Sequence, residues 1–387
     1  MYDVIVVGAG PAGSSAARAC ARMGLRTLLL DDASFPRYKL CGGGITAATK
    51  RVLGFRLDDG VVEREAKGMR IYLGNEWFDY RGKGEFVSLA MRTRFDWFLV
   101  QKAVEVGAEL LQKTRVKSAK VHPSHVEVAA TDGRAFEAKA LIGADGIPGT
   151  IASLVRGPIP RHELVVCAGV EVPVKDSRLG EELGDLLEVE FGFHRNSAGW
   201  CYGWVFPKEE SLSIGYGASL ADAPNIRKIL AGYLKRRGLG TGYRFDGHMI
   251  PIGGVRRKVH ADRVLLVGDA AGFADPITGE GIRYAVLSGQ IAGEQLVRSV
   301  ESDDFTESGM SWYAEECERR FGRDLRWGHR LMPILYNNLG LFFRLWRGNP
   351  SMMGQYFRTV TGEQTYEGFA KWCALRSPLL LANALRG

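Results

Sequence analysis

Glycines and an acid near the N-terminus stand at the spacing that dinucleotide binding needs. The stretch 8–13 reads GxGxxG, and the acid Asp31 follows about 20 residues after it. In such a motif the glycines permit a tight turn, a close approach of the backbone to a pyrophosphate, and close packing of a helix on a strand. The acid can accept a hydrogen bond from a ribose hydroxyl. The residues predicted to bind the dinucleotide here are Gly8, Gly10, Ala12, Gly13, Asp31 and Asp32.

The hydrophobic pattern predicts the elements around this motif. Residues 2–7 are a short, apolar and β-branched run, typical of a strand buried on both faces. Small residues from 14 to 23 predict a helix, and residues 27–30 predict a second buried strand. The helix N-terminus offers free N–H groups and the positive end of its dipole to phosphates. A glycine-rich turn in some other strand–helix unit is the alternative, and the placed acid argues against it.

A second candidate site begins at Cys41. Pro36 and the consecutive glycines Gly42, Gly43 and Gly44 predict a loop, because proline and repeated glycine interrupt regular structure. Such glycines let a flat ligand approach the backbone closely. The Cys41 thiol could face a ring or a substrate. A small buried cysteine is an equally good interpretation of this residue taken alone.

Later segments carry further candidate ligands. Asp145 and Asp269 each follow a run of apolar residues that predicts a buried strand. A carboxylate at Asp269 can bind a polyol hydroxyl, and the helix that begins at 279–283 can direct its positive dipole end at a flavin ring. Arg92 opens a helix predicted for 92–106, where an arginine can contact a cofactor. The candidates in these segments are Arg92, Asp145, Gly268, Asp269, Gly279, Gly281 and Ile282.

Alternating apolar and polar residues from about 161 to 254 predict a sheet-rich insertion. Within it, a two-residue period places Tyr202, Trp204 and Phe206 on one face of a strand. This aromatic stripe could be plain core or one wall of a substrate cavity.

Composition excludes several classes of function. The 387 residues are 46% hydrophobic and 25% charged, as in ordinary globular proteins. The net charge of +7 is compatible with an anionic membrane surface or a phosphorylated substrate, and equally with an arginine-rich proteome.

The six cysteines and seven histidines lack metal-ligand spacing, and neither a nucleic-acid module nor a hydrolase triad is recognisable. The N-terminus leads directly into the first strand, so we expect a cytoplasmic protein.

Three separated elements together resemble a known fold: 8–13 with Asp31, 144–146, and 268–269 with the following helix. They are similar to the FAD-binding fold shared by aromatic hydroxylases, flavin-dependent halogenases and geranylgeranyl reductases. The resemblance implies FAD as cofactor and an α/β fold, with a Rossmann-like FAD-binding domain of the p-hydroxybenzoate hydroxylase type, a β-sheet substrate domain and a helical C-terminal region. No second GxGxxG is present between these elements, which argues against a fixed NAD(P)H domain.

Two stretches resemble the geranylgeranyl reductases in particular. Residues 36–43 resemble their PxxYxxCGG motif, although the tyrosine stands one position nearer the proline, and residues 202–207 match YxWxFP. A halogenase would carry WxWxIP at the second stretch. In the reductase family the cysteine–glycine loop lies beside the flavin and the YxWxFP strand lines the prenyl cavity. The resemblance thus implies cofactor contacts at Cys41, Gly42, Gly43 and Gly44, and substrate contacts at Gly43, Tyr202, Trp204 and Phe206.

The predicted domains follow from this resemblance. Residues 1–70, 92–158 and 255–300 form a discontinuous FAD-binding domain; residues 71–91 and 159–254 form the substrate domain; and residues 301–387 form a helical region. Within the last region, the apolar segment 331–346 could dock on a membrane, line a tunnel or be an ordinary core helix.

We therefore expect an FAD-dependent reductase that saturates the C=C bonds of geranylgeranyl chains, with hydride from the reduced flavin N5. Cys41, Tyr202 and Trp204 are the expected catalytic residues, with Cys41 or a water that it orders as the proton source. The expected partners are an isoprenoid lipid, an external donor such as ferredoxin or NADPH, and a membrane at whose inner face the protein rests. The alternatives are an FAD monooxygenase or halogenase, and a prenyl-lipid carrier without enzyme activity.

Overall fold

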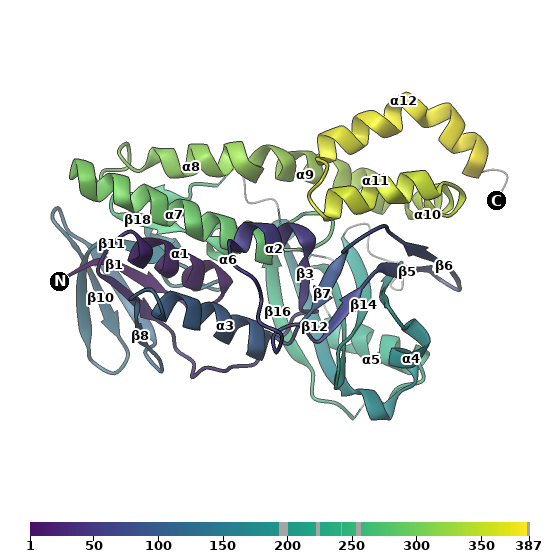
Figure 1. Cartoon of the computed structure of the whole chain (residues 1–387), viewed down its shortest axis with the longest axis horizontal. Coiled ribbons are helices and arrows are strands. Elements are labelled where there is room, and N and C mark those ends of the chain that lie inside the picture. Colours follow the sequence, from purple (N-terminus) through teal and green to yellow (C-terminus); the bar gives the residue numbers. More distant parts are fainter. Residues whose placement is uncertain (193–199, 222–224, 241, 253–256, 385–387) are drawn as a thin grey trace. The chain divides into compact units, whose positions relative to one another are not determined.

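The computed structural model describes residues 1–192, 200–221, 225–240, 242–252 and 257–384 (Figure 1). The chain divides into two units. The first comprises Met1–Tyr38, Thr93–Pro160 and Ile250–Arg326; the second comprises Lys39–Arg92, Arg161–Met249 and Trp327–Gly387.

This division differs from the domain boundaries predicted from the sequence. Residues 39–70 belong to the second unit, not to the unit that carries the dinucleotide motif. The predicted helical region 301–387 is shared, because its residues up to Arg326 belong to the first unit and the rest to the second. The predicted boundary at 254/255 and the last three residues lie outside the described residues.

The first unit is built on a mainly parallel sheet. Its strand order is β17-β18-β11-β1-β2-β8, and β10 and β9 extend it from β11. β1 pairs in parallel with β2 and β11, which is the arrangement of a doubly wound fold. The strands are β1 Tyr2–Val7, β2 Thr27–Leu30, β8 Glu109–Leu111, β9 Val116–Val121, β10 Val126–Ala130, β11 Ala135–Gly143, β17 His260–Ala261 and β18 Val264–Leu266.

Two long helices lie side by side in this unit, α1 (Pro11–Arg22) and α7 (Ile282–Ser302) (Figure 1). Glycines allow the close approach: a Cβ on Gly293 would lie 2.5 Å from Ala19 Cβ, and one on Gly289 would overlap the Ala12 carbonyl. The other helical elements of this part of the chain are α3 Arg92–Val104, η1 Ile151–Leu154, α6 Gly268–Ala271, α8 Ser311–Cys317 and the π-helical turn η5 Glu318–Gly322.

The second unit is built on a sheet of order β16-β12-β15-β14-β13-β5-β6. A smaller sheet of order β3-β7-β4 accompanies it, and the sequence patterns did not predict this sheet. The strands are β3 Gly44–Thr46, β4 Arg64–Ala66, β5 Gly68–Leu73, β6 Glu76–Arg81, β7 Val87–Leu89, β12 Leu164–Pro173, β13 Leu186–Phe191, β14 Cys201–Pro207, β15 Ser211–Ser219 and β16 Asp246–Pro251.

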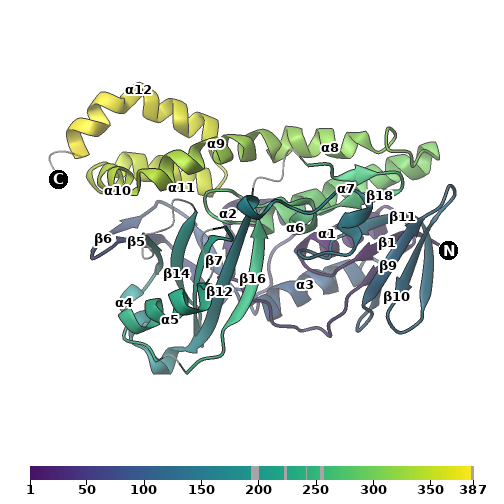
Figure 2. The same cartoon turned by 180° about the vertical axis from the view of Figure 1, so that it is seen from behind.

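The two faces of the larger sheet serve different purposes. One face packs on α5 (Ile226–Arg236), where Leu230, Tyr233 and Leu234 are fully buried in the core of this unit (Figure 2). Because side chains alternate along a strand, the residues paired as Trp204 and Gly215 lie on the opposite face. The candidate substrate residues therefore do not point into the core around α5.

Helices complete the second unit. Phe357 of α11 stacks on Phe86 at a centroid distance of 4.0 Å and meets the Tyr80 ring edge-on at 4.6 Å. These aromatic contacts attach the C-terminal helices to the two sheets. The helices are α2 Ala47–Leu53, η2 Arg161–Glu163, η3 Val174–Asp176, α4 Leu179–Leu183, α5, α9 Arg323–Asn337 (which begins in the first unit), α10 Leu339–Gly348, α11 Pro350–Val360 and α12 Tyr366–Ala384.

The strands predicted around the dinucleotide motif are confirmed, and the helix predicted for 14–23 starts earlier, at Pro11. Proline suits the first turn, since its missing N–H has no partner there in any helix. Across the residues that the structure describes, no helix combines the length and apolar character that crossing a membrane requires.

Candidate active site

The glycine motif of the first unit has the geometry of a phosphate-binding turn. Gly8 has φ +100°, and a Cβ on it would overlap the Ala144 carbonyl. A Cβ on Gly13 would overlap the carbonyl oxygen of Gly8, so the third glycine is needed for the helix to follow the turn this closely. The α1 N-cap, Gly10, provides no side-chain cap. The first N–H groups of α1 are therefore left to an anion.

Asp31 is fixed beside this turn. Its Oδ2 accepts a hydrogen bond from Ala9 N at 2.7 Å, and its Oδ1 accepts one from Ala33 N at 2.9 Å. Burial raises the pKa of this carboxyl, and the two backbone bonds oppose that rise. Each carboxylate oxygen can accept a further bond, so this position suits a ribose hydroxyl. Asp32, the neighbouring candidate, is exposed.

Arg37 is a site residue that the sequence analysis missed. Its Nη2 lies 3.6 Å from the position of a Cβ on Gly10, and its Nη1 pairs with the fully buried Asp96 at 3.1 Å. The guanidinium thus holds a positive charge above the glycine turn, where it can bind phosphate oxygens. The signal was present in the sequence, because Arg37 lies inside the cysteine–glycine motif.

Asp145 supports the turn that follows β11. Its Oδ2 accepts hydrogen bonds from the backbone N–H groups of Thr150 and Ile151, the latter at 3.0 Å. Burial raises the pKa of this carboxyl. The Oδ1 atom is buried without a partner among the described residues, so it remains available to a donor from a ligand.

The turn between β18 and α7 forms a second glycine-rich cradle in the first unit. Gly268 has φ +56°, and its N–H donates to Ser288 Oγ at 3.0 Å. Asp269 Oδ1 lies 3.4 Å from the position of a Cβ on Gly281, the N-cap of α7, which provides no side-chain cap. A carboxylate thus lies beside the N-terminus of α7.

The turn leading into α7 contains a carboxyl that the sequence analysis passed over. Glu280 Oε1 accepts a hydrogen bond from Arg283 N at 2.7 Å, and burial raises the pKa of Glu280 to about 7. Gly279, beside it, has φ +70°, which disfavours other residues. Ile282 begins α7 and is buried. Arg92, the remaining candidate, is buried at the start of α3.

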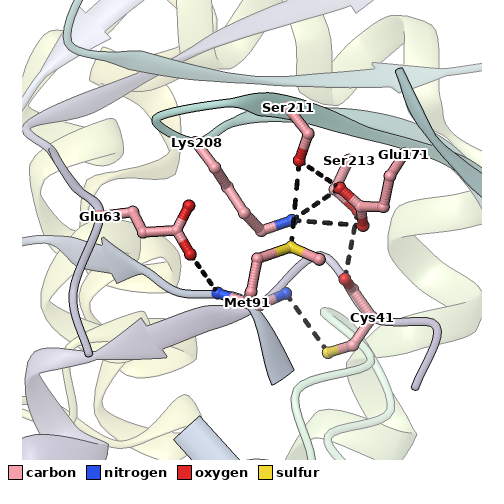
Figure 3. Close-up of polar contacts among 8 residues, drawn as sticks. Cys41, Glu63, Met91, Glu171, Lys208, Ser211 and Ser213 are labelled. Carbon is pink, nitrogen blue, oxygen red and sulfur yellow. Dashed lines mark hydrogen bonds and ion pairs between the residues drawn. The ribbon is translucent and has the colours of Figure 1, made fainter. Parts of the chain in front are cut away.

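In the second unit, Cys41 lies in a loop held by its own backbone (Figure 3). The Gly43 N–H donates to Cys41 Sγ at 3.4 Å, and Ser213 Oγ donates to the Cys41 carbonyl at 3.2 Å. Gly43 has φ +76° and receives the Ala90 N–H on its carbonyl at 3.0 Å. The thiol is free and half-buried, so it is neither sealed in the core nor fully solvated.

The two motifs that resemble the reductases meet in this unit. A Cβ on Gly42 would lie 2.6 Å from Phe206 Cδ2, and one on Gly44 would lie 3.5 Å from Phe206 Cε2. The Phe206 ring therefore packs directly on the glycine loop. The glycines here make room for an aromatic ring of β14, which explains why a side chain is excluded at position 42.

A buried ion pair lies under the same loop (Figure 3). Lys208, only 1% exposed, follows the YxWxFP stretch, and its Nζ lies 3.2 Å from Glu171 Oε2. Ser211 Oγ donates to the same oxygen at 2.7 Å. Lys208 Cε lies 3.2 Å from the position of a Cβ on Gly43, so the aliphatic part of the lysine packs against the loop. Sequence analysis missed Lys208, Glu171 and Ser211, because only the register of β12 and β15 brings them together.

Aromatic rings cover the sheet beside the loop. Tyr202 meets Trp204 edge-on at a centroid distance of 6.2 Å, and Trp200 lies 4.7 Å from Tyr202. Gly215, paired with Trp204 across β15, has no side chain and leaves space for the Trp204 ring. The Trp204 Nε1 is buried without a partner among the described residues. Tyr202 and Phe206 are half-buried, so part of this face is open.

The segment 331–346 contributes to the same aromatic cluster. Tyr336 of α9 lies 6.1 Å from the Phe191 ring and 6.2 Å from the Trp200 ring, and Trp346 of α10 lies 6.0 Å from Phe191. Both rings are buried. The segment therefore contributes buried rings to this unit, and it also keeps Ile334 and Leu341 exposed at the surface.

Known proteins are similar to this chain in sequence and in fold. Residues 1–187 match the family model described as FAD binding domain. Digeranylgeranylglycerophospholipid reductase 1 of Methanopyrus kandleri is 33% identical over 341 residues, which cover 83% of this chain and 87% of that protein. Geranylgeranyl diphosphate reductase of rice chloroplasts (Oryza sativa subsp. japonica) is 30% identical over 347 residues, which cover 82% of this chain and 72% of that protein.

A solved structure extends the likeness to the whole fold. A geranylgeranyl bacteriochlorophyll reductase-like protein of Thermoplasma acidophilum superposes with a TM-score of 0.79, covering 98% of each chain at 23% identity. This match confirms the predicted fold class of an FAD-binding α/β domain with a β-sheet domain and a helical C-terminal region. The uncapped α1 N-terminus, the fixed Asp31 and the Arg37 cation also fit the cofactor FAD. The chain belongs to the geranylgeranyl reductase family of FAD-dependent oxidoreductases.

Proposed function

We propose that this enzyme reduces isolated C=C bonds of geranylgeranyl chains, using FAD. The observation that carries the proposal is the contact between Phe206 and the Gly42–Gly44 loop. This contact places a thiol-bearing loop beside an aromatic strand within one unit. A site that holds an apolar chain next to a proton donor needs both parts. The names of the two relatives support the same substrate class.

Residues of the first unit would hold the cofactor. The glycine turn and the α1 N-terminus would bind the pyrophosphate, with charge neutralisation from Arg37. Asp31 would accept a ribose hydroxyl, and Asp269 would accept a hydroxyl of the flavin side chain. The positive dipole end of α7 would face the ring and favour its reduced anion. When bound and reduced, FAD supplies the hydride for the alkene.

Cys41 would supply the proton. An isolated alkene is a poor hydride acceptor, so the second carbon needs an acid in place as hydride arrives. The thiol gives its proton to that carbon, the C=C bond becomes C–C, and the remaining thiolate takes a proton from water. The half-buried position of Cys41 supports both steps, because the thiol can meet an apolar chain and solvent can still reach it.

The aromatic face would hold the chain. Tyr202 and Phe206 present partly exposed rings beside the loop, while Trp204 is almost fully buried and supports them. Alkene and alkyl groups pack favourably on such faces. Gly43, whose φ of +76° disfavours other residues, would keep the loop in this conformation beside the chain.

The Lys208–Glu171 pair would position the loop. A lysine buried to this degree needs a partner, and Glu171 with Ser211 provides a bonded one. Because Lys208 contacts the loop through its stem, removing it would loosen Cys41 without removing any atom from the thiol itself.

The redox partner and the location complete the proposal. Electrons would come from an external donor, ferredoxin or NADPH. The substrate would be a prenyl lipid or prenyl diphosphate, as in the names of the two relatives. Because such chains partition into bilayers, the enzyme would work in the cytoplasm at the inner face of a membrane.

The experiment uses the FAD-loaded full chain with a geranylgeranyl lipid in detergent micelles, dithionite and no oxygen. We expect each product to gain two hydrogen atoms per double bond. Cys41→Ser should keep its flavin absorption and reduce the alkene about 100-fold more slowly.

Three results would contradict the proposal. Addition of an oxygen atom once air is admitted would establish a monooxygenase. A colourless protein that takes up no FAD would favour a carrier. Undiminished reduction by the Cys41→Ser enzyme would remove the thiol from the mechanism.

A further inference from the structure

Two glycines on neighbouring strands let a tryptophan ring lie beside the Cys41 loop. Gly215 of β15 and Gly169 of β12 are register partners on the face of the larger sheet that carries Trp204. A Cβ on Gly215 would lie 2.0 Å from Trp204 Cζ2, and one on Gly169 would lie 2.6 Å from Leu40 Cδ1. The Trp204 ring and the Leu40 side chain therefore cover adjacent glycines. This arrangement places the indole next to the residue that precedes Cys41.

The indole N–H of Trp204 is a buried hydrogen-bond donor. The residue is only 7% exposed, and its Nε1 has no hydrogen-bond partner among the described residues. A buried tryptophan normally finds an acceptor for this N–H, because leaving it unpaired in apolar surroundings costs free energy. The same face of the sheet is partly open at Tyr202 and Phe206. The N–H is therefore suited to an acceptor oxygen that a ligand brings to this face.

The proposed substrate gives this donor a task that apolar contacts cannot perform. A geranylgeranyl chain repeats one isoprene unit, and apolar contact with aromatic rings is non-directional. The chain could therefore slide by one unit along the aromatic strand at little cost and bring a different C=C bond to Cys41. One end of the chain is distinct, because an oxygen atom joins it to the rest of the lipid or to the diphosphate.

We propose that the Trp204 N–H donates a hydrogen bond to this chain-end oxygen and so determines which C=C bond lies beside Cys41. The inference rests on the proposed function and adds a specificity-determining group to it. Trp204 and Phe206 are two residues apart on one face of β14, about 7 Å along the strand. The oxygen is thus held at a fixed distance from the ring that packs on the glycine loop, and the chain has one register instead of several.

The test compares two probes in detergent micelles, with the FAD-loaded full chain, dithionite and no oxygen. One probe is geranylgeranyl methyl ether, and the other is the hydrocarbon in which a methylene group replaces the ether oxygen. We expect the wild type to favour the ether about tenfold in kcat/KM, the effect of one hydrogen bond to an otherwise unpaired buried donor. The first product from the ether should be one positional isomer, identified by tandem mass spectrometry, whereas the hydrocarbon should give a mixture.

Trp204→Phe removes the N–H and keeps an aromatic ring. The smaller ring affects both probes, so the ratio of their kcat/KM values isolates the hydrogen bond. This ratio should fall to about one, and the ether should then give a mixture of isomers as the hydrocarbon does. Saturated forms of both probes cannot be reduced. Calorimetric titration with them should show the same preference of about tenfold in Kd for the wild type and none for the variant.

Trp346→Phe is the matched control. Trp346 is 4% exposed, and its Nε1 likewise has no partner among the residues that the structure describes. Its ring belongs to α10 and lies 6.0 Å from the Phe342 ring and 5.7 Å from the Tyr356 ring. The control variant loses a buried indole N–H of a helix and none of β14, so it should keep the preference for the ether and the single isomer.

Two results would overturn the inference. A Trp204→Phe enzyme that still favours the ether and still gives one isomer would show that the N–H does not bind the substrate oxygen. Weaker FAD binding by this variant, at an unchanged preference for the ether, would assign the N–H to the cofactor. Failure of the reductase proposal looks different, because neither probe would be reduced while the wild type still bound the saturated ether more tightly than the saturated hydrocarbon.

Discussion

Both candidate regions are glycine-rich turns, and their glycines are needed for different reasons. In the first unit, a side chain on Gly13 would overlap the backbone of Gly8, so the requirement comes from neighbours in the chain. In the second unit, a side chain on Gly42 would meet the Phe206 ring, which comes from a strand more than 150 residues away in the sequence. The packing of the first turn depends on residues close in the chain, whereas the packing of the second depends on a strand of the folded sheet.

The charged groups of the two regions differ in the same way. Arg37 and Asp31 lie within about 25 residues of the glycine motif, and each is anchored inside the same unit, Asp31 to Ala9 N and Arg37 to Asp96. Lys208 and Glu171 come from separate parts of the large sheet and meet under a loop from a third. We therefore expect damage to the first region to appear in FAD binding, and damage to the second to appear in reduction and in stability.

The largest expected effect is on the first turn. Gly13→Ala places a methyl group on the Gly8 carbonyl oxygen, and the rigid backbone has little room to move. FAD affinity should fall by at least about 100-fold, measured by flavin fluorescence titration, which corresponds to about 2.7 kcal/mol.

Gly157→Ala is the matched control for this variant, since nothing lies within 4 Å of the added methyl group and its φ is not left-handed. An FAD affinity of the Gly13→Ala protein close to that of the control would show that this turn does not hold the cofactor.

The next largest effect is on the buried pair. Lys208→Met leaves Glu171 without its cation. Breaking a fully buried ion pair costs about 3 kcal/mol or more, and because the Glu171 side chain is 18% exposed we expect a loss of about 2.5 kcal/mol here. Urea unfolding should report that loss, and the added change Glu171→Leu should recover part of it because no charge is then unpaired.

Lys258→Met breaks the exposed pair with Glu307 and should change the free energy of unfolding by less than about 1 kcal/mol. If Lys208→Met were equally mild, the pair would not support the loop.

A smaller effect tests the contact between the two motifs. Gly42→Ala pushes on the Phe206 ring, which can shift at a cost of about 2 kcal/mol. Phe206→Leu should relieve that strain, so the double variant should be more stable than the sum of the single changes predicts. Additive free energies of unfolding would mean that the loop and the strand do not press on each other.

The smallest effect concerns pH and the first unit. The folded protein holds the Glu280 proton more tightly than the unfolded chain, since burial raises its pKa from 4.5 to about 7. The unfolded carboxyl therefore ionises first as pH rises, and the stability contributed by this group is lost between about pH 4.5 and 7.

We expect the apoprotein to lose about 2 kcal/mol from this group between about pH 5 and 7, and Glu280→Gln to remove that slope. Urea unfolding across this range checks the prediction. Parallel pH profiles for the two proteins would contradict it.

The sequence predicted the local region well and the other region only in outline. Strands 2–7 and 27–30 and the acid at Asp31 could be found because each depends on neighbours in the chain. The division of the chain into units was harder to predict from the sequence. Residues 39–70 join the second unit through the small β3-β7-β4 sheet, whose short strands have only a weak hydrophobic pattern.

The polar residues of the second site could not be found from spacing. Glu171 faces Ser213 across β12 and β15, and Lys208 reaches both strands from a turn, so their meeting depends on register. Cys41 and Phe206 stood out by their loop and strand patterns, and their roles came from resemblance to a family, but the contact of the ring with Gly42 required the structure.

Anaerobic stopped-flow absorption can show whether hydride and proton reach an alkene held beside Cys41. The FAD-loaded protein is reduced with dithionite without excess and mixed with a geranylgeranyl lipid, and the flavin absorption near 450 nm is followed. We expect the wild type to regain this absorption without oxygen and Cys41→Ser to do so about 100-fold more slowly. If the absorption of the wild type stays bleached until air is admitted, the alkene is not the electron acceptor and the enzyme is not an alkene reductase.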